Sequence, residues 1–259
     1  MEQKRRSLTV GLFLLANAII LIMMAFVLAP LITYGHFAKD TESVILGIGQ
    51  IFAEIISVIL AWKWLGMLKI TDILAPIRVS CSSLTYIILF AVLCILGGEI
   101  LTSLLDLPDA LGLDNTLKRS SFMCVFICLI GPIMEEIISR GAIQGFLLRQ
   151  SVAPKYAIVT SALIFGITHM NPAQIPIATI VGLMLGIIYW KTGSLILPMF
   201  IHIANNSMSV FIQDMGAVNY VRLFGGTIPT VAIMICCFLL SIVFCWKLVK
   251  STPTYFDYT

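Results

Sequence analysis

The sequence predicts an all-α, polytopic membrane protein with about eight transmembrane helices and both termini in the cytoplasm. The 259 residues are 59% hydrophobic and only 11% charged, whereas soluble domains are about half apolar and a quarter charged. Apolar runs of about 20 residues, enough to cross a bilayer, follow one another along the chain. Basic residues gather in alternate connections between these runs. No stretch resembles a soluble domain, so residues 1–259 are expected to form a single membrane domain.

The apolar segments can be marked in order, each expected to be a helix that spans the bilayer. The first follows Lys4-Arg5-Arg6. It exceeds the apolar part of a signal peptide and has no clear cleavage site, which predicts an uncleaved helix. The fifth and sixth are short and separated by the turn signal Asn171-Pro172; two spans are predicted, with a re-entrant pair as the alternative. The eight segments are about residues 9–35, 43–65, 80–105, 121–148, 155–170, 174–190, 194–212 and 228–248.

Basic and aromatic residues predict the orientation of these helices, because cytoplasmic loops carry an excess of Lys and Arg. With a cytoplasmic N-terminus and eight crossings, 11 of the 16 basic residues fall on the cytoplasmic side. These are Lys4, Arg5, Arg6, Lys63, Lys69, Arg78, Arg149, Lys155, Lys191, Lys247 and Lys250. The outer loops hold Lys39, Lys118, Arg119 and Arg222. The four tryptophans, Trp62, Trp64, Trp190 and Trp246, fall at cytoplasmic helix ends, as an interfacial aromatic belt requires.

Composition also limits the classes of function. The formal net charge of +3 is too small to indicate a nucleic-acid partner, and in a membrane protein loop basicity mainly sets orientation. The seven cysteines have neither metal-ligand spacing nor the paired arrangement of a disulfide framework. They are expected to be small buried hydrophobic residues.

Six polar residues lie inside the apolar core of about residues 121–212, where ionisable side chains are costly and indicate function. They are Glu135, Glu136, Arg140, His169, His202 and Asn206. Spacing by four residues puts three pairs on shared helix faces: Glu136 with Arg140, Phe165 with His169, and His202 with Asn206. At about 1.5 Å per residue from the cytoplasmic helix ends, Glu135, His169 and His202 lie at roughly 20, 21 and 15 Å, and Asn206 at about 21 Å. One shared site near mid-membrane explains this common level; separate interhelical hydrogen bonds are the alternative.

This set of groups suits attack of an activated water on a carbonyl. Glu135 is the candidate general base, with His169 holding or polarising the water. His202 and Asn206 are candidate donors to the developing oxyanion, and Glu136 with Arg140 would orient the site, since Arg stays protonated. A zinc site made of Glu and His is a secondary alternative, although an HExxH helix motif is absent. A serine nucleophile is not indicated, because the sequence has no GxSxG motif.

Three motifs resemble those of one known family. Glu135-Glu136-xxx-Arg140, Phe165-xxx-His169 and His202-xxx-Asn206, in this order on separate helices, resemble the CPBP family of CAAX proteases and bacteriocin-processing enzymes. The resemblance covers about residues 131–207 and implies the eight-helix fold of intramembrane glutamate peptidases. It implies that Glu135 and His169 activate water, that His202 and Asn206 form the oxyanion hole, and that Glu136 and Arg140 support them, without a cofactor or an obligatory metal.

The expected function is therefore an intramembrane endopeptidase in a bacterial plasma membrane, acting on a membrane-associated, prenylated or leader-type peptide. A non-catalytic immunity or scaffold protein with a membrane partner is the alternative. A proton-coupled transporter is a third class, but the inverted repeats or paired broken helices typical of it are not seen. Two more intramembrane acids, Glu54 and Glu99, are candidates to line a substrate cavity.

Overall fold

The computed structural model describes residues 2–35, 37–73, 75–77, 79–108, 120–214 and 218–258, and each predicted apolar segment forms a helix within these ranges. Arg78, Lys118 and Arg119 lie outside them. The long helices are α1 (Glu2–Gly35), α2 (Lys39–Ile59), α4 (Cys81–Leu105), α9 (Pro154–Thr168), α10 (Ile175–Thr192), α11 (Ile196–Asp214) and α13 (Thr227–Ser251). A π-helical turn, η1 (Leu60–Trp64), continues α2. Short helices are α3 (Ile70–Ile73), α12 (Tyr220–Leu223) and the 3-10 turn η4 (Tyr255–Tyr258).

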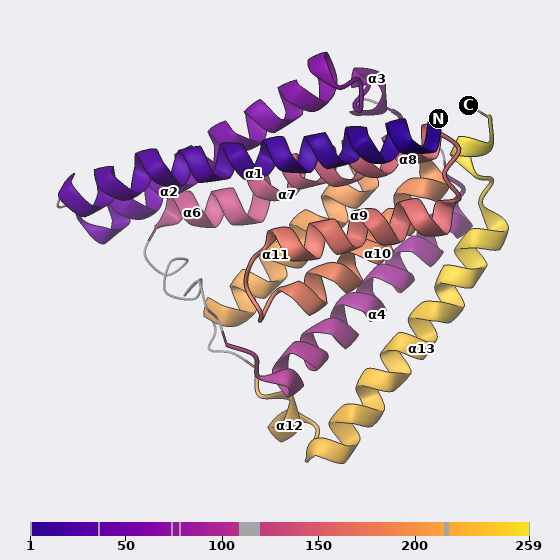
Figure 1. Ribbon diagram of the computed structural model, residues 1–259. Coiled ribbons are helices and arrows are strands. Elements are labelled where there is room, and N and C mark those ends of the chain that lie inside the picture. Colours follow the sequence, from indigo (N-terminus) through magenta and orange to yellow (C-terminus); the bar gives the residue numbers. More distant parts are fainter. Residues whose placement is uncertain are drawn as a thin grey trace.

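The helices confirm an all-α polytopic membrane protein. Among the described residues, six helices are long and apolar enough to cross a bilayer, and the segments Pro154–Thr168 and Ile196–Ile212 are shorter apolar helices. Figure 1 shows both chain ends, α3 and α8 (Gly145–Arg149) at one end of the bundle, with α12 at the opposite end. An even number of passes produces this arrangement. The count of eight crossings and the cytoplasmic side of the termini remain predictions.

The four tryptophans lie in η1 and near the C-terminal ends of α10 and α13, and helix ends are where an aromatic belt is expected. Three of them carry a lysine over the indole ring: Lys63 lies 5.0 Å from the Trp62 ring centroid, Lys191 4.9 Å from Trp190, and Lys250 4.3 Å from Trp246. These cation–π contacts pair an amphipathic ring with a charge that prefers the polar headgroup level. This pairing supports the predicted cytoplasmic interface.

The bundle has two apolar cores on either side of the motif-bearing helices. One core joins α10 to α4 and α13, and its fully buried residues include Ile87, Leu185 and Leu248. The other surrounds the C-terminal half of the 121–149 helix and includes Ala142 and Tyr189. α11 packs on α7 (Gly131–Glu136) and on α10, while α2 packs on α7 from another side. Glu136 of α7 is thereby enclosed by neighbouring helices and is fully buried.

The helix over residues 121–149 departs from the regular α winding assumed in the spacing argument. It runs as α6 (Ser121–Val125), the π-helical η2 (Phe126–Ile130), α7, the π-helical η3 (Ile137–Gln144) and α8. Pro132, at the start of α7, has no N–H to donate and its ring would clash with the carbonyl four residues earlier, so the backbone before it cannot keep the α pattern. Such π turns are frequent at functional sites, and here they flank the two motif glutamates.

Two glycines of α10 present their backbone carbonyls to the motif helix and let α10 pack closely on α9. Arg140 Nη2 donates to the carbonyl of Gly182 at 3.0 Å, and Gln144 Nε2 donates to that of Gly186 at 2.7 Å. These glycines are four residues apart, the small-residue spacing that allows helices to pack tightly in membranes. Two backbone carbonyls of α10 thus accept hydrogen bonds from the buried side chains of Arg140 and Gln144.

We expect Gly186→Ala to destabilise the protein by about 1–3 kcal/mol, because overpacking a tight interface has this cost. A Cβ at this position would lie 2.8 Å from Gln144 Oε1 and 3.1 Å from Ile158 Cγ2. Thermal unfolding in detergent, followed by circular dichroism, measures the loss as a lower Tm. Gly11→Ala is the matched control, because a Cβ there meets nothing within 4 Å; equal Tm values for the two variants would contradict the packing argument.

Candidate active site

Glu136 is the centre of a buried charge cluster that joins two helices. Its Oε1 accepts a hydrogen bond from Arg140 Nη1 at 2.7 Å, and both side chains are fully buried. The same oxygen lies 3.0 Å from His202 Nδ1 on α11, which donates to it. The predicted pairing of Glu136 with Arg140 is therefore present, and the structure adds His202 as a second partner. One carboxylate fixes both the cation and the imidazole.

Arg140 is held from three directions in addition to being buried. Besides Glu136 and the Gly182 carbonyl, its guanidinium carbon lies 4.6 Å from the centre of the Phe165 ring. The Phe165 ring in turn meets both histidines edge to face, with centroid distances of 4.9 Å to His169 and 5.5 Å to His202. Phe165 therefore packs between the cation and the two imidazoles, which sets their relative positions.

His169 lies one residue beyond the end of α9, rather than within the helix as the spacing predicted. Its Nδ1 is 2.9 Å from the carbonyl of Phe165. Because a carbonyl oxygen can only accept, Nδ1 carries the hydrogen, and a neutral ring then has Nε2 free as an acceptor. This arrangement leaves Nε2 available to hold a water molecule.

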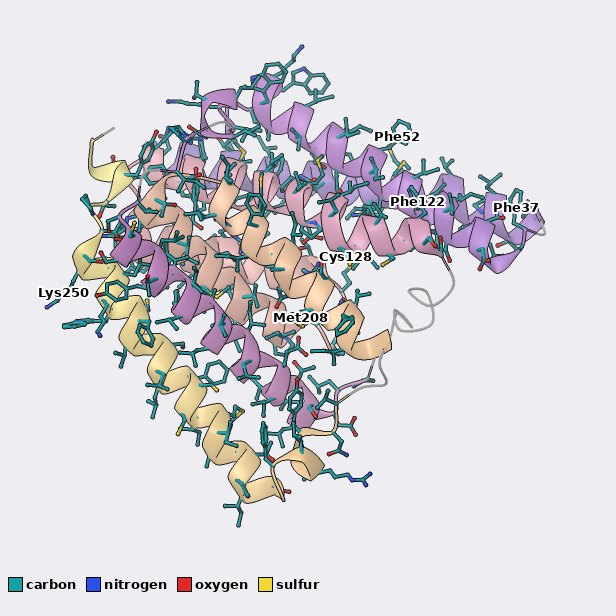
Figure 2. All side chains as sticks on the ribbon, turned by 180° about the vertical axis from the view of Figure 1, so that it is seen from behind. Phe37, Phe52, Phe122, Cys128, Met208 and Lys250 are labelled. Carbon is teal, nitrogen blue, oxygen red and sulfur yellow. The ribbon has the colours of Figure 1, made fainter. Side chains whose placement is uncertain are left out.

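Asn206 is tied to the motif helix. Its Nδ2 donates to the carbonyl of Ile127 in η2 at 3.0 Å, and its Oδ1 accepts from Asn205 Nδ2 at 3.1 Å. Since an amide nitrogen carries two hydrogens, one remains available after the bond to Ile127. Figure 2 labels Cys128 on η2 and Met208 on α11, two helices that pack on each other here.

Glu135 occupies a different position from Glu136. Its side chain is 32% exposed, and Oε2 lies 3.7 Å from His202 Nε2, beyond hydrogen-bond distance. This oxygen has no hydrogen-bond partner among the described residues. No direct hydrogen bond in the described part of the chain joins Glu135 to His169. Glu135, the residue expected to react, thus keeps a carboxylate oxygen without a hydrogen-bond partner.

A cavity of about 490 Å³ lies between α4 and α11 and meets the charge cluster at His202. Glu135, Glu136 and Arg140 are not among its lining residues. His169, His202 and Asn206 lie along its wall, as does Glu99, whose Oε1 accepts from Ser209 Oγ at 2.8 Å. The expectation that Glu99 lines a cavity is confirmed. Glu54 is not among the lining residues of this cavity; it is buried on α2, where Gln50 Nε2 donates to it at 3.2 Å.

The described side chains can be searched for a metal site, and they include one polar residue, Gln144, that was not predicted from the sequence. Within the described ranges, no group of three His, Cys, Asp or Glu side chains is arranged to hold a metal ion. Gln144 was not predicted, although it follows Glu136 and Arg140 at the same four-residue spacing. That regular spacing was the signal that could have identified it.

Comparisons with known proteins match the part of the chain that carries these contacts. Residues 118–208 fit the family model described as type II CAAX prenyl endopeptidase Rce1-like. Over these residues the chain is similar to Rce1-like proteins. The matched region contains all six residues predicted from the sequence, and the resemblance to CPBP proteases is confirmed. The Rce1-like region corresponds to the motif helix, α9, α10 and most of α11.

Two bacterial proteins are similar to this chain over about 100 residues each. The chain is 31% identical over 108 residues to “Putative membrane peptidase YdiL” of Bacillus subtilis, which is 42% of this chain and 44% of that protein. It is 32% identical over 101 residues to “Membrane-embedded CAAX protease MroQ” of Staphylococcus aureus, 37% of this chain and 41% of the relative. The chain thus covers less than half the length of these relatives. No solved structure matches. These likenesses and the apolar helices identify an integral, multi-pass membrane protein related to membrane proteases.

Proposed function

We propose that the protein is an intramembrane endopeptidase that hydrolyses a peptide bond with a water molecule activated by Glu135 and His169. The observation that carries the proposal is that two adjacent glutamates differ in burial and in hydrogen bonding. Glu136 is fully buried and bonded to Arg140 and His202, whereas Glu135 is partly exposed with an unpartnered oxygen. One carboxylate is structural and the other is free to take a proton.

The first step is attack of water on the carbonyl carbon of the substrate. Water bound between Glu135 and Nε2 of His169 gives a proton to the Glu135 carboxylate as its oxygen bonds to that carbon. The carbonyl oxygen gains the negative charge and is stabilised by donors placed in advance. The second hydrogen of the Asn206 amide is one assigned donor, since the first is bound to Ile127. His202 is the other, and it donates through Nε2 when both of its ring nitrogens carry hydrogen, because Nδ1–H is bound to Glu136.

The second step breaks the carbon–nitrogen bond. The tetrahedral intermediate collapses, and Glu135 returns the proton to the departing amine nitrogen, which leaves a free carboxylic acid and a free amine. Arg140 holds the Glu136 carboxyl group in place as the acceptor of His202. These steps use only side chains of this chain and assign no role to a metal ion or a cofactor.

The proposed substrate is a membrane-associated protein or peptide, prenylated or of the leader type. The cavity extends from the catalytic histidines past Ile177 and Val181 to Glu99 and Ser209. Its wall is mixed apolar and polar, as expected for a site that accepts an extended peptide from a bilayer. The lipid bilayer is thus part of the working environment.

His169→Ala tests the proposal in purified protein reconstituted in liposomes. Two internally quenched peptides serve as probes, one farnesylated at a C-terminal CAAX sequence and one with the same sequence unprenylated. We expect the parent to cleave at least one probe and His169→Ala to lower kcat by about 10²–10⁴-fold, the usual contribution of a positioned acid–base group. His36→Ala is the control for loss of a histidine. Equal rates for His169→Ala and the parent would reject the assignment.

A further inference from the structure

The carbonyl of Ile127 lacks the backbone donor that a regular helix would provide. In η2 the N–H of Gly131 donates to the carbonyl of Phe126, five residues back. In an α-helix the same N–H would donate four residues back, to Ile127. The π turn therefore removes the normal partner of the Ile127 oxygen.

Pro132 removes the other candidate donor. At π spacing the Ile127 carbonyl would accept from residue 132, and proline has no N–H. Ile127 is half-buried in a membrane-spanning helix, where a backbone carbonyl without a donor is unfavourable, so the oxygen needs a partner from elsewhere. Asn206 Nδ2 on α11 supplies it at 3.0 Å. The sequence Gly131-Pro132 thus creates a backbone acceptor that faces a neighbouring helix.

We infer that Pro132 is a positioning residue for Asn206, acting through the freed carbonyl of Ile127. The inference rests on the proposed function, because the position of the amide affects turnover only if Asn206 stabilises the oxyanion. The bond to Ile127 uses one amide hydrogen, and the bond from Asn205 to Oδ1 fixes which end of the amide carries nitrogen. The remaining hydrogen is then held in one direction, which is the preorganisation that an oxyanion donor requires.

Pro132→Ala introduces a backbone N–H at residue 132, five residues after the Ile127 carbonyl. This N–H can donate to the Ile127 carbonyl at π spacing, or the segment can return to α spacing and let Gly131 donate to it. In either case the backbone competes with Asn206 for one acceptor. Alanine also favours helices far more than proline does, so the variant is expected to fold with the Asn206 amide released.

The first test observes the Asn206 amide directly by NMR, in detergent-solubilised protein labelled with ¹⁵N at asparagine. Asn206→Ala identifies the side-chain NH₂ signals. We expect Pro132→Ala to shift them and Pro229→Ala, in the first turn of α13, to leave them unchanged. Unmoved Asn206 signals in Pro132→Ala would overturn the inference. A Pro132→Ala protein that does not fold would overturn it too, since Pro132 would then be a structural residue.

The second test is a double-mutant cycle, using whichever quenched peptide the parent cleaves. Loss of one oxyanion donor lowers kcat by about 10²–10³-fold, and we expect Pro132→Ala to lower it by about tenfold or more with KM changed less than about twofold. In an Asn206→Ala background, Pro132→Ala should add less than about twofold, because coupled residues are not additive. Full additivity would reject action through Asn206. Parental kcat in Asn206→Ala would instead reject the proposed oxyanion role, while the NMR result still decides the positioning role.

Discussion

Glu135→Gln is expected to lower kcat by about 10³-fold or more while leaving the fold intact. The amide cannot take a proton from water, and general-base catalysis contributes about 10²–10⁴-fold. The side chain is partly exposed and its Oε2 has no hydrogen-bond partner, so the loss of charge should change stability by less than about 0.5 kcal/mol. Cleavage of the quenched peptides and Tm in detergent measure the two quantities together. Glu42→Gln, in the first turn of α2, is the control for the same change of charge.

The same variant separates an enzyme from a non-catalytic membrane protein. Membrane and secreted peptides can be compared by mass spectrometry between a parent strain and a Glu135→Gln strain with equal protein levels. Peptides that lose processing identify the substrate. Processing at the parental rate would show that Glu135 is not the base. Immunity or signalling that persists in the Glu135→Gln strain would favour the alternative role in which the polar cluster binds a partner.

Arg140→Met is expected to have the largest effect on stability. It leaves the Glu136 carboxylate buried without its cation, and breaking a buried ion pair from one side costs about 3–5 kcal/mol. The Gly182 carbonyl and the Phe165 ring lose their partner as well. For a chain of this size that loss lowers Tm by about 10 °C, measured by circular dichroism in detergent.

The double variant Glu136→Gln, Arg140→Met distinguishes an unpaired charge from lost packing. It removes both charges, so we expect it to recover a large part of the stability lost in Arg140→Met, without recovering activity, because His202 loses its carboxylate acceptor. Arg140→Lys keeps the charge and should lie between the parent and Arg140→Met, since one ammonium cannot match the planar guanidinium. A Tm for Arg140→Met equal to that of the parent would contradict the buried-pair argument.

Much of the fold was predictable because apolar segment length and residue spacing can be read directly from the sequence. Apolar segments of about 20 residues are visible in the sequence, and four-residue spacing correctly paired Glu136 with Arg140. Counting residues from helix ends placed the polar residues of three helices at one level, where contacts between α7 and α11 now join them. The resemblance to CPBP proteases followed from the same residues, and the family comparison matches the region that contains them.

The contacts between helices were not predictable from these signals. Residue spacing gives the face of one helix but not the neighbour that it meets, so the bond between Glu136 and His202 was not foreseen. A regular helix was assumed over 121–148, and hydropathy is insensitive to the π turns that replace it. The bond from Asn206 to Ile127 involves a backbone atom, which no side-chain pattern reports.

The partners of Arg140 also determine when the protein can complete its assembly in the membrane. Glu136 is in the same helix, but Phe165 and Gly182 belong to α9 and α10, which are synthesised later. Until those helices are inserted, the 121–149 segment holds Glu135, Glu136 and Arg140 away from its ends with few partners, a costly state in a bilayer. The segment gains full stabilisation only when the α9–α10 hairpin arrives. Insertion of this region should therefore be cooperative, and the helix that carries the motif glutamates is completed by helices that follow it in the chain.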